Sequence, residues 1–212
     1  MTRGKFIVLE GGEGAGKSTQ ARLLAEALAA RGLDIVTTRE PGGTPGAETI
    51  RTLLLDLEGE EWGLRAEALL FAAARADHVE RLIRPAIEAG TWVICDRFLD
   101  SNRAYQGGAG GLQDEDIVTL HRIGSAGLLP DMTLLIEVPP EVAAERLAMR
   151  DQEGGDRIGG RDASYHARVA ATFVQLAEAE PNRFRRVDSS GSRETTHLAI
   201  MDLLAPLLDS AE

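Results

Sequence analysis

The chain has 212 residues, of which 43% are hydrophobic, 23 are basic and 34 are acidic, so its formal net charge is −11 at pH 7. This length suits one sizeable α/β core and is short for two full domains, so a single domain over residues 1–212 is predicted. The acidic balance argues against a nucleic-acid polymer as partner, because such polymers are bound by basic surfaces. Apolar runs stay well below the roughly 20 residues of a membrane span, and the first residues lead into a strand and not into a signal peptide. The single Cys95 offers neither a disulfide framework nor zinc spacing, so a cytoplasmic protein without a membrane partner is expected.

Strand-like and helix-like segments alternate along the chain. Strands are predicted over residues 5–10, 34–38, 91–96, 132–138 and 184–188, and helices over 18–31, 47–55, 64–89, 114–126, 140–150, 165–180 and 194–208. Pro85 is expected to kink the helix over 64–89 or to mark a break near its end. The polar, glycine-rich segment 151–162 is predicted to be a mobile loop. This alternation predicts an α/β fold of three layers, with a five-stranded parallel sheet and helices on both of its faces.

Residues 11–18 read Gly-Gly-Glu-Gly-Ala-Gly-Lys-Ser and fit the phosphate-binding pattern G-x-x-x-x-G-K-[ST] between the first strand and the first helix. The glycines let backbone N–H groups point inward at phosphate oxygens, and the helix N-terminus adds its positive dipole end. Lys17 is expected to reach the outer phosphates, and the Ser18 hydroxyl to bind Mg²⁺. A glycine-rich turn that matches by accident is the alternative, and the flanking strand and helix disfavour it. The predicted ATP-binding residues are Gly11, Gly12, Glu13, Gly14, Ala15, Gly16, Lys17, Ser18 and Thr19.

The strand predicted over 91–96 ends in Asp96 and is followed by Arg97. Ligands of open α/β sheets bind beyond the carboxyl ends of the strands. An Asp at this position in a phosphate-loop protein is placed to hold Mg²⁺ through its water shell, so Asp96 and Ser18 are the predicted metal residues. A helix-capping or turn Asp is the alternative. Arg97 would lie at the same edge, within reach of a second phosphate, which suggests a kinase whose acceptor is itself a phosphate.

Five segments, in the same order and at the same spacing, resemble bacterial thymidylate kinases over essentially the whole chain. They are the phosphate loop with its acidic Glu13, residues 38–44 (Thr-Arg-Glu-Pro-Gly-Gly-Thr), residues 69–75, residues 96–108, and residues 130–131 with 138–142. The resemblance implies a phosphate-loop nucleoside monophosphate kinase that transfers the γ-phosphoryl group of ATP to dTMP, giving dTDP and ADP, with Mg²⁺ as cofactor. It also implies a homodimer, whose interface could be formed by residues 66–76 and 114–126, although these could equally be core.

The same resemblance implies an acceptor site. Phe71 is implied to stack on thymine and Arg75 to hydrogen-bond its carbonyl edge, and at i and i+4 the two share one helix face. Arg51 and Arg97 are implied to grip the acceptor phosphate. The other implied substrate-binding residues are Glu13 at the sugar 3′-hydroxyl, Ser101 and Gln106 beside the nucleotide, and Tyr105 against the ribose 2′ position. Without the resemblance, Phe71 could be ordinary core and Arg51 a solvated surface residue.

Position 14 divides the family, because some members carry arginine there whereas others have glycine and supply arginines from a lid. This chain has Gly14, so a lid at about residues 151–162 is implied to close and bring positive charge to the transferred phosphoryl group. A charged surface loop is the alternative. Arg146, Arg150, Arg157 and Arg161 flank or occupy the lid, and the predicted catalytic residues are Lys17, Arg97, Arg150 and Arg157.

Two departures from the family pattern lie near the acceptor segment. Residues 109–111 (Ala-Gly-Gly) lack the arginine usual there, for which Arg103 could substitute, and Phe98 replaces a tyrosine or histidine. The four histidines have no ligand spacing and are interpreted as structural. Another nucleoside monophosphate kinase, a deoxynucleoside kinase and a nucleotide-binding switch remain as alternatives. The deoxynucleoside kinase would need a carboxylate at its hydroxyl acceptor, and the switch would leave Phe71 and Arg75 unexplained.

Overall fold

A computed structural model describes residues 3–56, 59, 61–150 and 158–209, and describes residues 148–150 by their backbone alone. Within these residues, five parallel strands form one sheet in the order β2-β3-β1-β4-β5. The strands are β1 (Phe6–Glu10), β2 (Ile35–Arg39), β3 (Trp92–Asp96), β4 (Met132–Glu137) and β5 (Phe184–Asp188). Each strand lies within one residue of its predicted bounds, and the predicted α/β class is confirmed.

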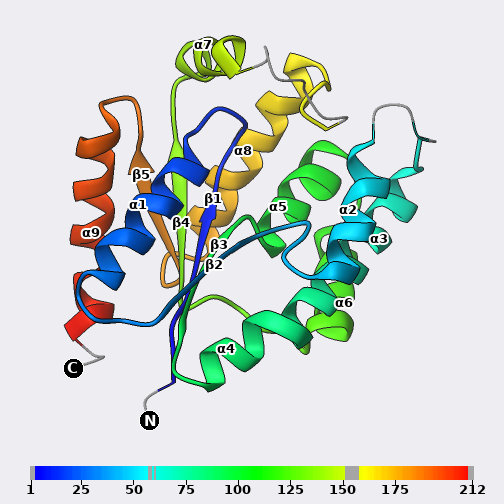
Figure 1. Ribbon diagram of the computed structural model, residues 1–212. Helices are drawn as coiled ribbons and strands as arrows, with labels where there is room; N and C mark the ends of the chain where they lie inside the picture. Colours follow the sequence, from blue (N-terminus) through cyan, green and yellow to red (C-terminus); the bar gives the residue numbers. More distant parts are fainter. Residues whose placement is uncertain (1–2, 57–58, 60, 151–157, 210–212) are drawn as a thin grey trace.

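Helices cover both faces of the sheet, which gives the predicted three layers (Figure 1). One face carries α1 (Lys17–Ala29) and α9 (Arg193–Asp209), and α7 (Pro140–Arg150) lies beyond the carboxyl edge of the sheet. The other face is covered by α3 (Leu64–His78), α4 (Arg84–Glu88), α5 (Leu99–Asn102), α6 (Asp114–Ser125) and α8 (Ala163–Ala179), and α2 (Pro45–Leu55) packs on α3.

The pleat of the strands divides the core into clusters on opposite faces. Successive side chains of a strand point to opposite faces, so a strand buried on both faces reads as a continuous apolar run. In β1, Ile7 and Leu9 pack with residues of α1 and α9, whereas Phe6 and Val8 pack on the other face with Phe98. All four side chains are fully buried.

The structure corrects the helix predicted over residues 64–89. After α3 the chain forms a π-helical segment, η1 (Val79–Ile83), and α4 begins only at Arg84. Pro85 lacks a backbone N–H and its ring would clash with the carbonyl four residues earlier, so the wider π turn directly before it relieves the conflict. The interruption therefore lies upstream of Pro85 and not at the helix end.

A second π-helical segment, η2 (Arg103–Ala109), continues α5 through a region for which no helix was predicted. It carries the segment that resembles the acceptor region of thymidylate kinases. Residues 99–109 therefore hold their side chains on a helical scaffold against the carboxyl edge of the sheet (Figure 1).

The sheet order places a topological switch at its centre. β1 pairs with β3 on one side and β4 on the other, and Leu9 is in register with Asp96. The loops that leave β1 and β3 therefore meet at one edge, where α/β proteins bind ligands. None of the helices in the described part of the chain is long and apolar enough to cross a membrane.

Candidate active site

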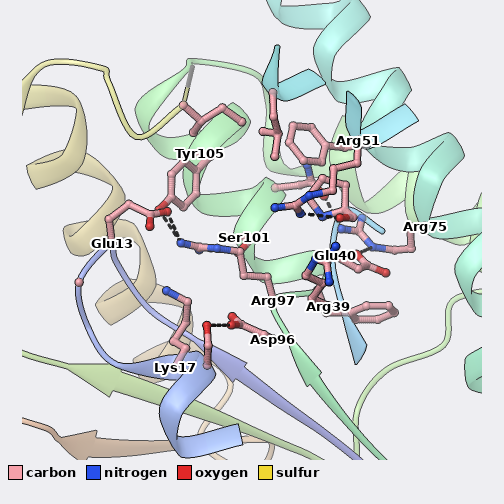
Figure 2. Close-up of a pocket in the computed structure, with 18 of the residues that line it drawn as sticks. Glu13, Lys17, Arg39, Glu40, Arg51, Arg75, Asp96, Arg97, Ser101 and Tyr105 are labelled. Carbon is pink, nitrogen blue, oxygen red and sulfur yellow. Dashed lines mark hydrogen bonds and ion pairs between the residues drawn. The ribbon is translucent and has the colours of Figure 1, made fainter. Parts of the chain in front are cut away.

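A cavity of about 520 Å³ opens at this edge and runs from the phosphate loop to α2 and α3 (Figure 2). Its lining brings together most residues singled out in the sequence: Glu13, Gly14, Gly16, Lys17, Ser18, Thr19, Arg51, Phe71, Arg75, Asp96, Arg97, Ser101, Tyr105 and Gln106. It also includes residues for which no role at the site was predicted: Arg39, Glu40, Pro41, Leu55, Asn102, Leu147 and Ile158. The volume is that of a small-molecule site.

The loop between β1 and α1 has the backbone that its glycines allow. Gly11, Gly14 and Gly16 have φ values of 143°, 73° and 94°. A Cβ at Gly11 would lie 2.3 Å from the Ile136 carbonyl oxygen, so only glycine fits there. The loop therefore packs tightly against the end of β4.

Lys17 turns back into this loop. Its Nζ donates to the Gly12 carbonyl oxygen at 2.8 Å, and the residue is 6% exposed. Burial, with a further contribution from the positive charge of Arg97, lowers the pKa of Lys17 to about 8. The ammonium group is thus held among loop atoms that a phosphate would approach.

Ser18 and Asp96 meet at the floor of the cavity. The Ser18 Oγ donates to Asp96 Oδ2 at 2.5 Å, and the other carboxylate oxygen, Oδ1, is buried without a hydrogen-bond partner in the described residues. A hydroxyl beside a carboxylate is the oxygen donor set that Mg²⁺ accepts together with water and substrate phosphates. The described residues contain no cluster of three or more His, Cys, Asp or Glu that would hold a metal by itself. The residues present therefore fit a nucleotide-bound Mg²⁺.

Arg97 crosses the middle of the cavity. Its backbone is left-handed, with φ of 70°, and its guanidinium donates to Glu13 Oε1 at 2.5 Å, the Tyr105 hydroxyl at 3.2 Å and the Gly11 carbonyl at 3.1 Å. Figure 2 shows Arg97 reaching toward Glu13, with the Tyr105 ring above it. The guanidinium carbon lies 5.1 Å from the centroid of that ring. Arg97 is therefore fixed between the phosphate loop and η2.

Glu10 supports the strained turn at Arg97 from below, and sequence analysis missed it. Its carboxylate accepts from the Phe98 N–H at 2.8 Å, the Ser101 N–H at 3.0 Å and the Ser101 hydroxyl at 2.6 Å. Burial, with the nearby negative charge of Asp100, raises the pKa of Glu10 to about 7. A charged residue ending an otherwise apolar strand is the signal that could have found it.

Arg75 and Phe71 line the wall formed by α3. Arg75 is 3% exposed, its Nε donates to Glu40 Oε2 at 2.8 Å, and its guanidinium carbon lies 5.0 Å from the centroid of the Phe98 ring. Phe98, the departure from the family pattern, thus packs beneath Arg75. Glu40 also binds His78 Nδ1 at 3.1 Å, so this histidine has a structural role.

Arg51 of α2 also lines the cavity, and its Nη1 donates to the Pro41 carbonyl oxygen at 2.7 Å. Gln106 is 1% exposed, and its Nε2 donates to Glu67 Oε1 at 2.6 Å. Ser101 accepts from Arg97 at 3.1 Å. Arg51 lies on α2, Gln106 on η2 and Ser101 on α5, so three different helical elements hold these side chains at the cavity.

The residues flanking the predicted lid have defined positions. Arg146 of α7 lines the cavity and donates to the carbonyl oxygens of Ser189 at 2.8 Å and Ala15 at 3.4 Å. A Cβ at Gly14 would lie 2.7 Å from the Ala143 carbonyl oxygen of the same helix. The Arg150 side chain and all of Arg157, together with residues 151–157 of the lid, lie outside the described residues.

Arg103 does not replace the arginine absent from residues 109–111. In the described part of the chain it lies outside the cavity lining, and it pairs with Asp114 at 2.7 Å, Glu180 at 2.5 Å and Asp100 at 3.3 Å. These three acidic partners, of which only Asp100 is fully buried, hold the guanidinium away from the acceptor wall. The expectation that Arg103 substitutes at the site is therefore wrong.

Cys95 and His121 are packing residues, as expected. Cys95 is fully buried, its Sγ donates to the Arg97 carbonyl at 3.0 Å, and burial raises its pKa. His121 Nε2 bonds to the Leu128 carbonyl at 2.8 Å, and burial lowers its pKa to about 4. Neither residue contributes to the cavity lining within the ranges that the structure covers.

Comparison with known proteins matches this architecture to one family. A family profile described as thymidylate kinase matches residues 9–200. The chain is 60% identical over 205 residues to a thymidylate kinase from Rhizorhabdus wittichii, covering 97% of this chain and 99% of the relative. It is 43% identical over 208 residues to a thymidylate kinase from Caulobacter vibrioides, covering 98% of this chain and 99% of that relative. A crystal structure of thymidylate kinase from Ehrlichia chaffeensis superposes with a TM-score of 0.78 at 30% identity, covering 95% of this chain and 99% of that one. The chain therefore belongs to the thymidylate kinase family.

Proposed function

We propose that this member of the thymidylate kinase family transfers the γ-phosphoryl group of ATP to dTMP inside the cavity, acting as one nucleotide kinase domain. One observation carries the proposal: the phosphate loop and the Phe71–Arg75 wall line the same cavity, with Arg97 between them. A donor phosphate held at Lys17 and an acceptor phosphate held at Arg97 would meet in that space. Positioning and electrostatics then carry the reaction, since an acceptor phosphate already bears an ionised oxygen near neutral pH and needs no general base.

The donor site is formed by residues 11–19. Backbone N–H groups of the loop bind the phosphates, and Lys17 exchanges its bond to the Gly12 carbonyl for bonds to the outer phosphate oxygens. Arg146 adds a cation at the loop, because its guanidinium already lies on the Ala15 carbonyl. Arg150 and Arg157 remain predicted catalytic residues of the lid.

The acceptor site lies between α2, α3 and η2. Phe71 stacks on the base, Arg75 binds the base edge, and Arg51 with Arg97 binds the acceptor phosphate. The remaining contacts come from Glu13 at the sugar hydroxyl and from Ser101, Tyr105 and Gln106 along the wall formed by α5 and η2. These roles are those that the family resemblance implies, and the geometry supports them because all of these residues line one cavity.

Mg²⁺ is proposed at Ser18 and Asp96, whose oxygens meet at the cavity floor. When bound there, Mg²⁺ would offset the negative charge of the transferred group. Asp96 holds the Ser18 hydroxyl in place and presents its second oxygen, which is buried and unpartnered among the described residues. Asp96→Asn should therefore raise the Mg²⁺ concentration needed for half-maximal activity.

A coupled ADP-release assay across nucleoside monophosphates tests the proposed function. Only dTMP and its close analogues should support turnover, and Arg75→Ala should raise KM for dTMP far more than KM for ATP. One lost charged hydrogen bond costs about 1.5–3 kcal/mol, or about ten- to a hundredfold. Arg81→Ala is the matched control, because this arginine lies just beyond the end of α3 and its side chain is 69% exposed. Equal losses for donor and acceptor in Arg75→Ala would contradict the base-reading role.

A homodimer is proposed from the family resemblance, and the structure shows which side chains are exposed for it. Helices α3 and α6 pack against each other within the chain, where a Cβ at Gly124 would lie 3.3 Å from the Ala76 Cβ. Leu69 on α3 and Ile123 on α6 are nonetheless 56% and 76% exposed. Light scattering of Leu69→Glu and Ile123→Glu should show monomers if this face is the interface. A cytoplasmic location stays a prediction.

A further inference from the structure

A continuous row of polar side chains runs behind the acceptor wall and ends at a guanidinium on each side. Arg161 donates to Glu67 Oε2 at 2.6 Å, and Gln106 Nε2 donates to Glu67 Oε1 at 2.6 Å. Gln106 Oε1 in turn accepts from Asn102 Nδ2 at 2.7 Å, and Asn102 Oδ1 accepts from Arg75 Nη2. Arg75, Asn102 and Gln106 line the cavity, whereas Glu67 is 5% exposed and lies behind it.

The order of donors and acceptors in this row depends on Glu67. A guanidinium only donates and a carboxylate only accepts, whereas an amide accepts at one end and donates at the other. Two donating ends can be joined through amides only if one acceptor-only group stands between them. Glu67 is that group, and it turns the NH₂ of Gln106 toward itself and the oxygen of Asn102 toward Arg75. Arg75 requires the Asn102 oxygen at one end, and Glu67 requires the Gln106 NH₂ at the other. Both requirements are met at once because Glu67, a residue outside the cavity, only accepts.

We propose that Glu67 is a positioning residue that selects the acceptor base by fixing the Asn102 oxygen beside the Arg75 guanidinium. The proposal rests on the proposed function, in which Arg75 binds the base edge. A donor next to an acceptor complements a pyrimidine that carries O4 and an N3–H, as thymine and uracil do. Cytosine presents the reverse order, an N4 amino group and an unprotonated N3. Its amino group would therefore face the Arg75 donor, and its N3 would face the Asn102 oxygen.

Glu67→Gln tests this role with little change in size. With glutamine at position 67, every group between the two guanidinium ends is an amide, so one donor must face another donor. When the new amide keeps accepting from Arg161, it donates to Gln106, both amides reverse, and this mismatch falls between the Asn102 NH₂ and Arg75. The ratio of kcat/KM for dTMP to that for dCMP should then fall about tenfold or more, the usual worth of a specific base-edge pairing. KM for ATP should not change. The ratio of dTMP to dUMP should not change either, because the two bases present the same O4 and N3–H edge.

The double variant Glu67→Gln, Gln106→Glu separates donor–acceptor order from a merely structural effect. It moves the acceptor-only group one place along the row. The new amide at position 67 accepts from Arg161, and the new carboxylate at position 106 accepts both from that amide and from Asn102. The Asn102 oxygen faces Arg75 again, and the dTMP preference should return. Gln106→Glu alone is the matched control. It sets two carboxylates against each other and should lower thermal stability, but the carboxylate at position 106 still accepts from Asn102, so the dTMP-to-dCMP ratio should be kept.

The outcomes distinguish this proposal from the proposed function. A folded wild-type protein that does not phosphorylate dTMP would refute the proposed function. If wild type is active and Glu67→Gln keeps its dTMP-to-dCMP ratio, or if the double variant fails to restore the ratio, the role of Glu67 is refuted. Thermal unfolding monitors folding of each variant. Should Glu67→Gln alone not fold, the double variant decides: a wild-type ratio supports the proposal and a lost ratio overturns it.

Discussion

Raising the pH from 7 to 9 should weaken ATP binding, because Lys17 loses its proton in this range in the nucleotide-free protein. Burial, aided by Arg97, lowers the Lys17 pKa to about 8, and the ammonium group donates to the Gly12 carbonyl oxygen. Only the charged form pairs with phosphate, so ATP binding must restore a lost proton. The charged fraction is about 0.9 at pH 7, about 0.5 at pH 8 and about 0.1 at pH 9. The dissociation constant of ATP should therefore rise about tenfold between pH 7 and pH 9.

Isothermal titration calorimetry in two buffers of different ionisation enthalpy measures both the dissociation constant of ATP and the number of protons taken up on binding. At pH 8 binding should take up about half a proton per ATP. The control is Lys17→Arg, whose guanidinium stays charged through pH 9, so its affinity should be lower but constant. Constant wild-type affinity without proton uptake at pH 8 would refute the reasoning. The same pH dependence in Lys17→Arg would assign it to another group, with Glu10 the first to examine.

Three further predictions concern groups around the site. The pKa of Glu10 is raised from 4.5 to about 7, so the native state keeps a proton that the unfolded chain has lost, and stability should fall as pH rises through that window. Urea unfolding at pH 5 and pH 7.5 should show this decline in wild type and a smaller one in Glu10→Gln. Arg103→Ala should lower the free energy of unfolding by about 2–3 kcal/mol, since fully buried Asp100 loses one of its two arginine partners, while kcat changes little. Gly14→Ala should cost about 1–2 kcal/mol and reduce kcat, because its φ is 73° and its Cβ would lie 2.7 Å from a backbone oxygen of α7. A wild-type melting temperature in Gly14→Ala would contradict that packing.

Strands β1, β3 and β4 could be predicted because each is a short, largely apolar run that ends at polar or turn residues, a signal local to the sequence. In β2 and β5 the signal is weaker, because polar residues are mixed with the apolar ones. The π-helical segments could not, since their hydrogen-bond spacing is a response to tertiary demands. Pro85 correctly predicted an interruption of the helix expected over residues 64–89, but the interruption lies in the π-helical turn before Pro85. Residues 99–109 have no helical periodicity, and their start is fixed by Glu10, which is far away in the sequence.

The site divides in the same way. Residues of the phosphate loop act through contiguous backbone, so a local motif suffices to identify them. The acceptor residues were implied by resemblance, because nothing local distinguishes Arg51 from a solvated arginine. Glu40 and Glu67 were missed: each is a carboxylate whose role depends on cations that arrive from other elements, Arg75 for the first and Arg161 for the second. Buried charge pairs of this kind can be inferred only once the fold brings their partners together.

The need for glycine at position 14 and the position of the Arg146 side chain both follow from the packing of α7 against the phosphate loop. Helix α7 lies so close to the phosphate loop that any side chain at position 14 would meet the Ala143 carbonyl oxygen. The same closeness sets the Arg146 guanidinium on the Ala15 and Ser189 carbonyls, beside the place where phosphates would bind. Charge of this kind acts locally, because exposed charges are screened beyond about 10 Å at 0.1 M salt. A net charge of −11 therefore does not by itself oppose nucleotide binding at this edge, where the Arg146 cation of α7 lies beside a loop that has no room for a side chain at position 14.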